Sequence, residues 1–299
     1  MISNFILLPS KTIRTIGVLF IKIAQVLDFD EKFKKSKIMK KGLKMNLYKT
    51  RFNDFFWLNE NKYLDKSIIE NGIFEKYSTQ IINQLVKKGD FVLDIGANIG
   101  YYSVLFSKLV GETGVVFCFE PTEHYSSVLE MNLEANNIQN AEVFKVGLSN
   151  KRQKLEIQIG NSSATLHPIE NQAIIKEELI MLTTLDDFML QHKLQKIDLV
   201  KIDIDGHEPL FFEGAQKTLD KFNPIVLLEV NHLNYIEAGF SAWDFYDFLK
   251  QNHYIIYSED GLIEFKTKEA FLRKCGNFAY SANIIISRKE IDASKYFKM

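Results

Sequence analysis

The chain has 299 residues, of which 46% are hydrophobic and 25% charged, a composition typical of a folded globular protein and unlike that of a disordered chain. Its length suits one α/β domain of ordinary size with an extension. The formal net charge is −1, so the overall charge gives no attraction to nucleic acid. The two cysteines, Cys118 and Cys275, form neither a CxxC pair nor a zinc pattern, which makes a reducing, cytoplasmic setting the default expectation.

Residues 1–66 are predicted to form a helical, lysine-rich extension, followed by one domain at residues 67–299. Residues 13–27 are apolar along one helical face but carry charged residues, which makes them too polar for a membrane-spanning helix. Residues 32–51 contain nine basic residues and no acid. A solvated helical face is the simplest interpretation of this cluster. The alternatives are an anchor on an anionic membrane surface and, less favoured, contact with nucleic acid.

From residue 67 onward, buried strands alternate with helices, which predicts an α/β fold with a doubly wound, mostly parallel sheet. The strands expected in this sheet are residues 91–94, 115–119, 142–146, 197–203 and 225–230. The helices expected between them are residues 68–88, 102–109, 124–136, 209–222 and 242–252. Segments 154–159 and 178–182 predict a small β insertion at the sheet edge, and segments 254–258 and 282–287 predict a terminal antiparallel hairpin.

A glycine-rich turn follows the first expected strand, with the sequence DIGANIG from Asp94 to Gly100. The second strand ends at Glu120, 24 residues after Gly96. Such a turn and such an acid hold the two ends of a nucleoside ligand, and the acid binds the ribose hydroxyls. The spacing differs from the GxGxxG of dinucleotide folds, and Asp94 would repel a phosphate but suit a cationic ligand such as S-adenosylmethionine. A nicotinamide-dinucleotide fold with drifted glycine spacing is the alternative.

Three acids and a histidine gather after the fourth expected strand: Asp203, Asp205, His207 and Glu208. The carboxyl ends of parallel strands meet at one edge of the sheet, so these residues are expected near Gly96 and Glu120. Helix capping by Asp205 and Glu208 explains part of the pattern. Because four titratable residues within six positions converge on the expected ligand edge, a functional site is favoured.

The segments VLDIGANIGYYS, FEP, VGLSN, LTTLDDF and KIDIDGHEPLFFEGA together resemble FkbM-type methyltransferases, a family of class I S-adenosylmethionine-dependent enzymes. The resemblance spans residues 71–287. It implies a Rossmann-like fold, S-adenosylmethionine as cofactor, and O-methylation of a hydroxyl on a sugar, a glycan or a secondary metabolite. One departure is Asp205, where the family more often has Glu.

The resemblance also implies roles for individual residues. Cofactor binding is expected at Asp94, Gly96, Ala97, Asn98, Gly100, Glu120, Pro121, Gly147, Leu148 and Ser149. The candidates for the catalytic base are Asp203, Asp205, His207 and Glu208. A sulfonium methyl group is already activated, so the protein needs to align the acceptor and remove a proton rather than supply a nucleophile.

The sequence leaves the metal site, the partner and the alternative functions open. No metal site is expected, although Asp203, Glu229 and Asn231 at the ends of neighbouring strands form one candidate set for a divalent cation such as Mg²⁺. The expected partner is a small-molecule or glycan acceptor, with peripheral contact to an anionic membrane through the N-terminal extension. The alternative functions are an NAD-linked Rossmann oxidoreductase and a non-catalytic Rossmann-like binding protein, which the fold alone does not exclude.

Overall fold

The structure is a computed structural model that describes residues 45–159, 164–165, 176–278 and 280–296. The chain divides into two compact units, Met1–Asn46 and Leu47–Met299. Almost all of the first unit lies outside the described residues, and so do the amphipathic segment and most of the lysine cluster predicted there. None of the described helices has the length and apolar character needed to cross a membrane.

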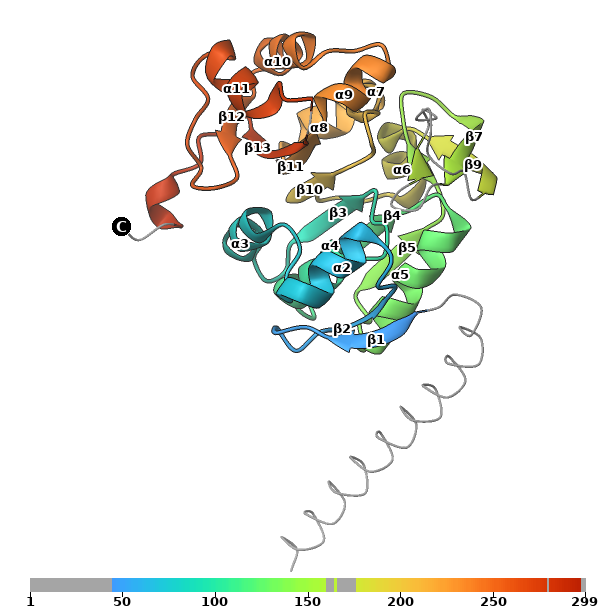
Figure 1. The fold of residues 1–299 in the computed structure, drawn as a ribbon. Coiled ribbons are helices and arrows are strands. Elements are labelled where there is room, and N and C mark those ends of the chain that lie inside the picture. Colours follow the sequence, from blue (N-terminus) through green and yellow to red (C-terminus); the bar gives the residue numbers. More distant parts are fainter. Residues whose placement is uncertain (1–44, 160–163, 166–175, 279, 297–299) are drawn as a thin grey trace, which may run out of the picture. The chain divides into compact units, whose positions relative to one another are not determined.

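The second unit is built around a seven-stranded, mostly parallel sheet (Figure 1). Strands β5, β4, β3, β10 and β11 run parallel to one another, and β13 lies antiparallel between β11 and β12. The doubly wound α/β fold and the terminal antiparallel hairpin are therefore confirmed. In spatial order the strands are β12 (Ile255–Ser258), β13 (Ala282–Ser287), β11 (Ile225–Val230), β10 (Leu199–Ile202), β3 (Phe91–Ile95), β4 (Val115–Phe119) and β5 (Ala141–Phe144).

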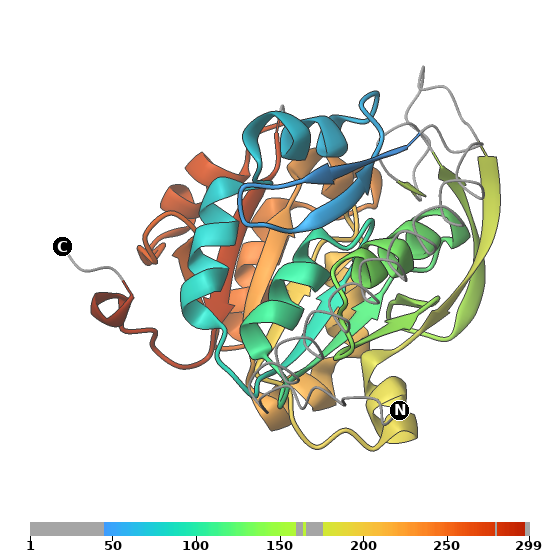
Figure 2. The same ribbon diagram turned by 90° about the horizontal axis from the view of Figure 1, so that it is seen from below.

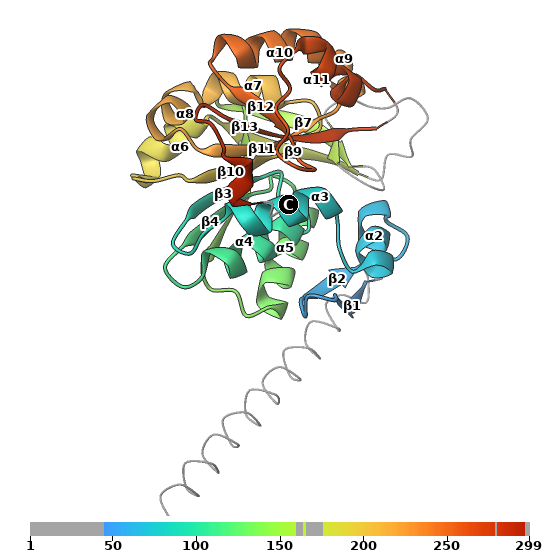
Figure 3. The same ribbon diagram turned by 90° about the vertical axis from the view of Figure 1, so that its left-hand side faces the viewer.

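The central strands are almost continuously apolar because helices cover both faces of the sheet. Helices α3, α4 and α5 lie on one face, and α7, α8 and α10 lie on the other (Figures 1 and 3). The helices of this unit are α2 (Tyr63–Asn71), α3 (Lys76–Leu85), α4 (Tyr101–Val110), α5 (Glu123–Ala135), α6 (Leu185–His192), α7 (Glu208–Gly214), α8 (Gln216–Phe222), α9 (His232–Glu237), α10 (Ala242–Gln251) and α11 (Lys268–Cys275), with a 3-10 turn at Ala293–Lys295.

Two of the expected helices are each divided into two. The segment expected at residues 68–88 forms α2 and α3, because Gly72 adopts a left-handed conformation (φ 65°) and ends α2. The segment expected at residues 209–222 forms α7 and α8, which meet at Ala215. The strands at residues 225–230 and 282–287 have the expected bounds.

The expected β insertion forms a separate four-stranded sheet in the order β6 (Gly147–Leu148), β9 (Lys176–Thr183), β7 (Gln153–Ile159) and β8 (Ala164–Thr165). Strands β7 and β9 pair antiparallel and extend along one side of the unit (Figure 2). Ile157, Ile180 and Leu182 on the inner face of this pair are buried together.

Residues 46–58 form a two-stranded sheet of β1 (Asn46–Lys49) and β2 (Phe55–Leu58). Strand β2 is held on α5, where the Trp57 amide donates to Asn132 Oδ1 at 2.7 Å. The side chains of Phe56 and Leu58 are buried. Residues 47–58 belong to the second unit, which begins at Leu47 and therefore before the boundary expected at residue 66.

Candidate active site

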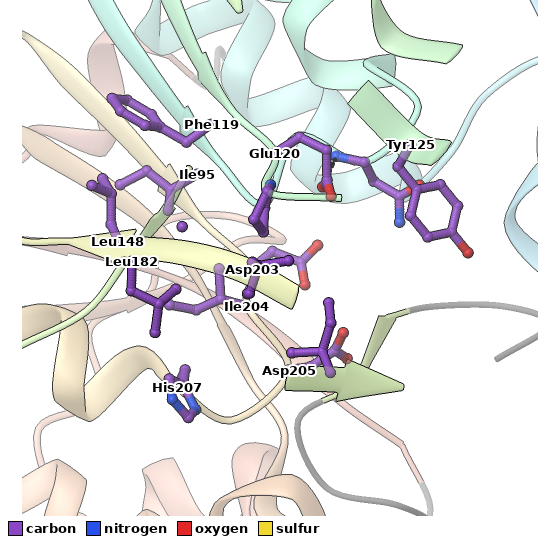
Figure 4. Close-up of a pocket in the computed structure, with 16 residues that line it drawn as sticks. Ile95, Phe119, Glu120, Tyr125, Leu148, Leu182, Asp203, Ile204, Asp205 and His207 are labelled. Carbon is purple, nitrogen blue, oxygen red and sulfur yellow. Dashed lines mark hydrogen bonds between the residues drawn. The ribbon is translucent and has the colours of Figure 1, made fainter. Parts of the chain in front are cut away.

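A pocket lies where β3, β4 and β10 end, and it contains about 780 Å³ of empty space including the part open to solvent. Its position, outside the carboxyl ends of these parallel strands, is where doubly wound sheets bind ligands. Figure 4 shows that the pocket is divided by polarity. Ile95, Phe119 and Leu148 lie at one end, whereas the carboxylates of Glu120, Asp203 and Asp205 lie toward the other.

Nine of the residues predicted from the sequence line this pocket: Gly96, Asn98, Glu120, Pro121, Gly147, Leu148, Asp203, Asp205 and His207. The other five do not line it, and they are Asp94, Ala97, Gly100, Ser149 and Glu208. All five are buried or are helix-cap residues in the segments that carry the lining residues.

The glycine turn is fixed to the end of β4 by backbone hydrogen bonds. The amides of Gly96 and Ala97 both donate to the carbonyl oxygen of Phe119 at 3.0 Å. Gly96 has φ 74°, and a Cβ atom there would lie 1.8 Å from the backbone oxygen of Asp203. Only glycine fits at this position, because both the backbone conformation and the close approach exclude a side chain.

Glu120 is buried, and both of its carboxylate oxygens accept hydrogen bonds from the protein. Its Oε2 accepts a hydrogen bond from the Asn98 amide at 3.0 Å. Its Oε1 accepts from the Thr122 amide at 3.0 Å and the Thr122 hydroxyl at 2.7 Å. A carboxylate has about four acceptor positions, so these three donors leave capacity on Oε2 for a ligand hydroxyl. Burial raises the pKa of Glu120, and the hydrogen bonds from Thr122 and Asn98 oppose that rise.

Asp94, in β3 just before the turn, does not line the pocket. It is fully buried, and its Oδ2 accepts a hydrogen bond from the Ser103 hydroxyl at 2.5 Å. Burial raises its pKa, and the nearby ammonium of Lys201, 4.0 Å from Oδ1, acts in the opposite direction. The expectation that Asp94 itself lines the cofactor site has no support in this geometry.

Two acids after β10 differ in their position: Asp205 lines the pocket, whereas Glu208 does not. Asp205 lines the pocket in a left-handed conformation (φ 53°). Burial and then the charge of Asp203 raise the pKa of Asp205 to about 7, although Lys201 opposes the rise. Glu208 is buried, and its Oε1 accepts from the Ile204 amide at 2.9 Å, which fixes the loop. Burial raises the pKa of Glu208 to about 8.

Two of the candidate cation ligands, Glu229 and Asn231, lie at the end of β11 and at the start of α9. The Asn231 side chain caps α9 by accepting from the Asn234 amide at 3.2 Å. Burial, with the charges of Asp203 and Asp205, raises the pKa of Glu229 well above its usual value. Within the part of the chain that the structure describes, no group of three or more His, Cys, Asp or Glu side chains is arranged to hold a metal ion.

Several residues of this region were not among those predicted from the sequence. Lys201 is buried beside the pocket with its ammonium 3.0 Å from Asp203 Oδ2, and a lysine inside an apolar strand was the available signal. Tyr125 lines the pocket from α5. Ile157, Ile180 and Leu182 line it from the β insertion, where alternating apolar residues indicated a buried face without indicating what it covers.

The chain matches known proteins by family sequence pattern, by sequence identity and by structure. The sequence pattern of the methyltransferase FkbM domain matches residues 94–276, and that of the protein-L-isoaspartate(D-aspartate) O-methyltransferase family matches residues 31–151. The 2-O-methyltransferase NoeI of Sinorhizobium fredii is 26% identical over 162 residues. That match covers 49% of this chain and 65% of NoeI, which is less than two thirds of the relative's length.

Solved structures of methyltransferases match at low identity. The methyltransferase FkbM from Methylobacillus flagellatus is 15% identical with a TM-score of 0.45, and the match covers 71% of this chain and 47% of that one. A SAM-dependent O-methyltransferase from Thermotoga maritima is 14% identical with a TM-score of 0.43, and the match covers 82% of this chain and 79% of that one.

The FkbM match extends from Asp94 in β3 to Gly276 after α11 and so includes the glycine turn, Glu120 and the acids after β10. It accounts for more than half of the chain. The chain belongs to the FkbM methyltransferase family, whose members depend on S-adenosylmethionine.

Proposed function

We propose that the protein transfers a methyl group from S-adenosylmethionine to a hydroxyl oxygen of a sugar, a glycan or a secondary metabolite. The observation that carries this proposal is one pocket with a preoriented acceptor, Glu120, on one wall and Asp203 and Asp205 on another. Membership in the FkbM family supports the cofactor. The name of the relative NoeI, a 2-O-methyltransferase, supports an oxygen acceptor.

The pocket suits each part of S-adenosylmethionine. Phe119, Leu148 and Leu182 form an apolar end for the adenine ring. The remaining acceptor capacity of Glu120 suits a ribose hydroxyl, and the Gly96 turn and Asp203 border the polar end where the methionine part would lie. When bound, this cofactor supplies a methyl group that is already activated as a sulfonium.

Asp205 is the proposed general base. A base works best when its pKa is close to the working pH, and the pKa of Asp205 is about 7. Asp203 is already engaged by the ammonium of Lys201, and Glu208 does not line the pocket. His207 lines the pocket at the N-terminal end of α7 and remains a second candidate.

An exposed aromatic surface beside the acids supports an acceptor with broad apolar faces, such as a glycan. The ring of His232 packs against Trp243 and Phe278, with ring centroids 5.2 and 4.6 Å apart. Trp243 and Phe278 are themselves 45% and 59% exposed. Helix α9, which begins at His232, touches the acidic segment through the Asn234 amide group, 3.4 Å from Asp205 Oδ1. Exposed apolar surface next to a polar site marks a binding face.

Transfer of tritiated methyl groups to a panel of sugars, glycans and lipid-linked glycans tests this function. Asp205→Asn should abolish transfer while S-adenosylhomocysteine still binds. Trp243→Ala should raise KM for the acceptor more than it lowers kcat, and Leu190→Ala, which removes a side chain that is 75% exposed on α6, is the matched control. Full transfer by Asp205→Asn would exclude Asp205 as the base. Binding of NAD without binding of either sulfur compound would replace the proposal with the oxidoreductase alternative.

We also propose that the protein works in the cytoplasm at an anionic membrane surface. The support is the lysine-rich sequence of residues 32–51, next to an amphipathic segment. In a flotation assay, the intact protein should rise with vesicles that contain phosphatidylserine and stay below with neutral phosphatidylcholine vesicles. Equal behaviour with both vesicle types would contradict this location.

A further inference from the structure

The buried side chain of Lys201 lies between two walls of the pocket. Its ammonium is 3.0 Å from Asp203 Oδ2 and makes a longer hydrogen bond of 3.4 Å to the carbonyl oxygen of Gly96. Gly96 and Asp203 both line the pocket, the first from the glycine turn and the second from the end of β10. One cationic group therefore links the two segments that border the polar end of the pocket.

The sheet register places this lysine. Lys201 pairs with Asp94 on the neighbouring parallel strand β3, so the two side chains leave the sheet on the same face. Lys201 and Asp203 are two residues apart, so extended backbone directs them to that same face as well. The strand itself, Leu199–Ile202, is buried at every position. A lysine at such a position costs desolvation energy and persists where charged partners compensate it.

The charged and polar groups around Lys201 come from β3, from α4 and from the start of α3. Asp94 Oδ1 of β3 lies 4.0 Å away, and the ring centroid of Tyr102 of α4 lies 5.3 Å away. The Tyr102 hydroxyl donates to Glu75 Oε2 at 2.7 Å, at the start of α3. Burial lowers the pKa of Lys201, but the carboxylates of Asp203, Asp94 and Glu75 together outweigh it and raise the pKa above its usual value.

We propose that Lys201 is a positioning residue that holds the glycine turn and Asp203 in the arrangement that binds the methionine part of the cofactor. This inference rests on the proposed function, because it takes S-adenosylmethionine as the ligand. Without the ammonium, the carbonyl oxygen of Gly96 and the carboxylate of Asp203 would face each other with no donor between them. The buried carboxylate of Asp94 would also lose its nearby cation.

These two consequences can be separated by experiment. Lys201→Met should lower thermal stability, because it leaves Asp94 buried without compensation. Adding Asp94→Asn removes that buried charge and should restore much of the lost stability. The double variant still lacks the link between Gly96 and Asp203. It should therefore remain poor at binding S-adenosylhomocysteine, whereas a purely structural role of Lys201 would let affinity recover together with stability.

The measurement is isothermal titration with S-adenosylhomocysteine, beside thermal unfolding, on the full chain. We expect Kd to rise roughly tenfold or more in Lys201→Met and to stay raised in Lys201→Met/Asp94→Asn, as for loss of a charge-assisted contact. Lys196→Met is the matched control. Lys196 precedes the same strand, donates to the Gly89 carbonyl oxygen at 3.1 Å and pairs with Asp198 at 2.9 Å, away from the pocket residues. Its loss should change Kd less than twofold, within the range of ordinary surface substitutions.

Wild-type affinity in the double variant, or in Lys201→Met itself, would overturn this inference. So would a double variant that is no more stable than the single one, including one that does not fold. If Lys201→Met alone does not fold, the double variant decides the question. Failure of the wild-type protein to bind S-adenosylhomocysteine would instead overturn the proposed function, and this inference with it.

Discussion

The backbone oxygen of Asp203 lies 1.8 Å from the position that a Cβ atom on Gly96 would occupy. The glycine turn after β3 and the acidic segment after β10 are therefore in direct backbone contact at the edge of the pocket. The Asp203 amide also donates to the Ile95 carbonyl oxygen at 3.1 Å, next to the turn. The two segments meet at the pocket, so a change in either should affect a ligand that touches both.

Gly96→Ala tests this contact. Alanine at φ 74° costs about 1 kcal/mol, and the clash with Asp203 adds to that cost, so we expect a total loss of stability of about 3 kcal/mol or more. Gly239→Ala is the matched control, because Gly239 has φ 83° and no atom within 4 Å of its Cβ position. Denaturation in urea gives both values. Equal losses of stability in the two variants would show that the close contact with Asp203 adds nothing to the cost of the alanine.

Asp205→Asn should change how stability depends on pH. The folded-state pKa of Asp205 is about 7, and the unfolded value is about 3.9. Because the folded state binds the proton more tightly, the charged carboxylate is disfavoured there, and wild-type stability should fall as pH rises from about 4 to 7. The variant lacks this titration, so its stability relative to that of wild type should be greater at pH 8 than at pH 4. Parallel stability curves would contradict the raised pKa.

Glu208→Gln should change stability at a higher pH than Asp205→Asn does. The pKa of Glu208 is about 8, so the side chain is mostly protonated at neutral pH and glutamine imitates it. Its Oε1 can still accept from the Ile204 amide. Thermal unfolding should therefore give nearly equal Tm values for variant and wild type at pH 6, with the variant more stable at pH 9. A large loss of stability at pH 6 would mean that the wild-type residue is ionised there.

Two truncated proteins should show at which residue the folded unit begins. Removing residues 1–46 should leave the fold and the binding of S-adenosylhomocysteine intact, because the second compact unit begins at Leu47. Removing residues 1–66 also deletes β2, whose Phe56, Trp57 and Leu58 are buried, and should lower Tm sharply. Thermal unfolding and titration check both. Equal stability of the two truncated proteins would return the boundary to residue 66.

The local sequence was sufficient to predict the sheet, the glycine turn, Glu120 and the acids after β10. Each of these depends on a short pattern: an apolar strand followed by a turn or by a carboxylate. The role of Asp94 could not be predicted, since its surroundings depend on Lys201, which lies 107 positions later and becomes a neighbour only through the pairing of β3 with β10. Nor could composition reveal that β2, next to a lysine-rich segment, packs on α5 through Asn132.

The contribution of the β insertion to the pocket could not be predicted from the sequence either. Alternating apolar residues in β7 and β9 predict one buried face, but that pattern does not say which surface covers it. In the structure, Ile157 and Leu182 line the pocket, so the insertion supplies part of its apolar lining. Contacts between elements distant in the sequence decide this, and a single sequence does not contain them.

The most direct test of the S-adenosylmethionine site is isothermal titration of wild type and Glu120→Ala with S-adenosylhomocysteine, with Glu123→Ala as a control for a mostly exposed glutamate nearby. We expect wild type and Glu123→Ala to bind alike. Glu120→Ala should bind roughly tenfold more weakly or worse, because the ribose hydroxyls lose a charged acceptor. No binding by the wild-type protein, or equal binding by Glu120→Ala, would contradict the proposed cofactor site.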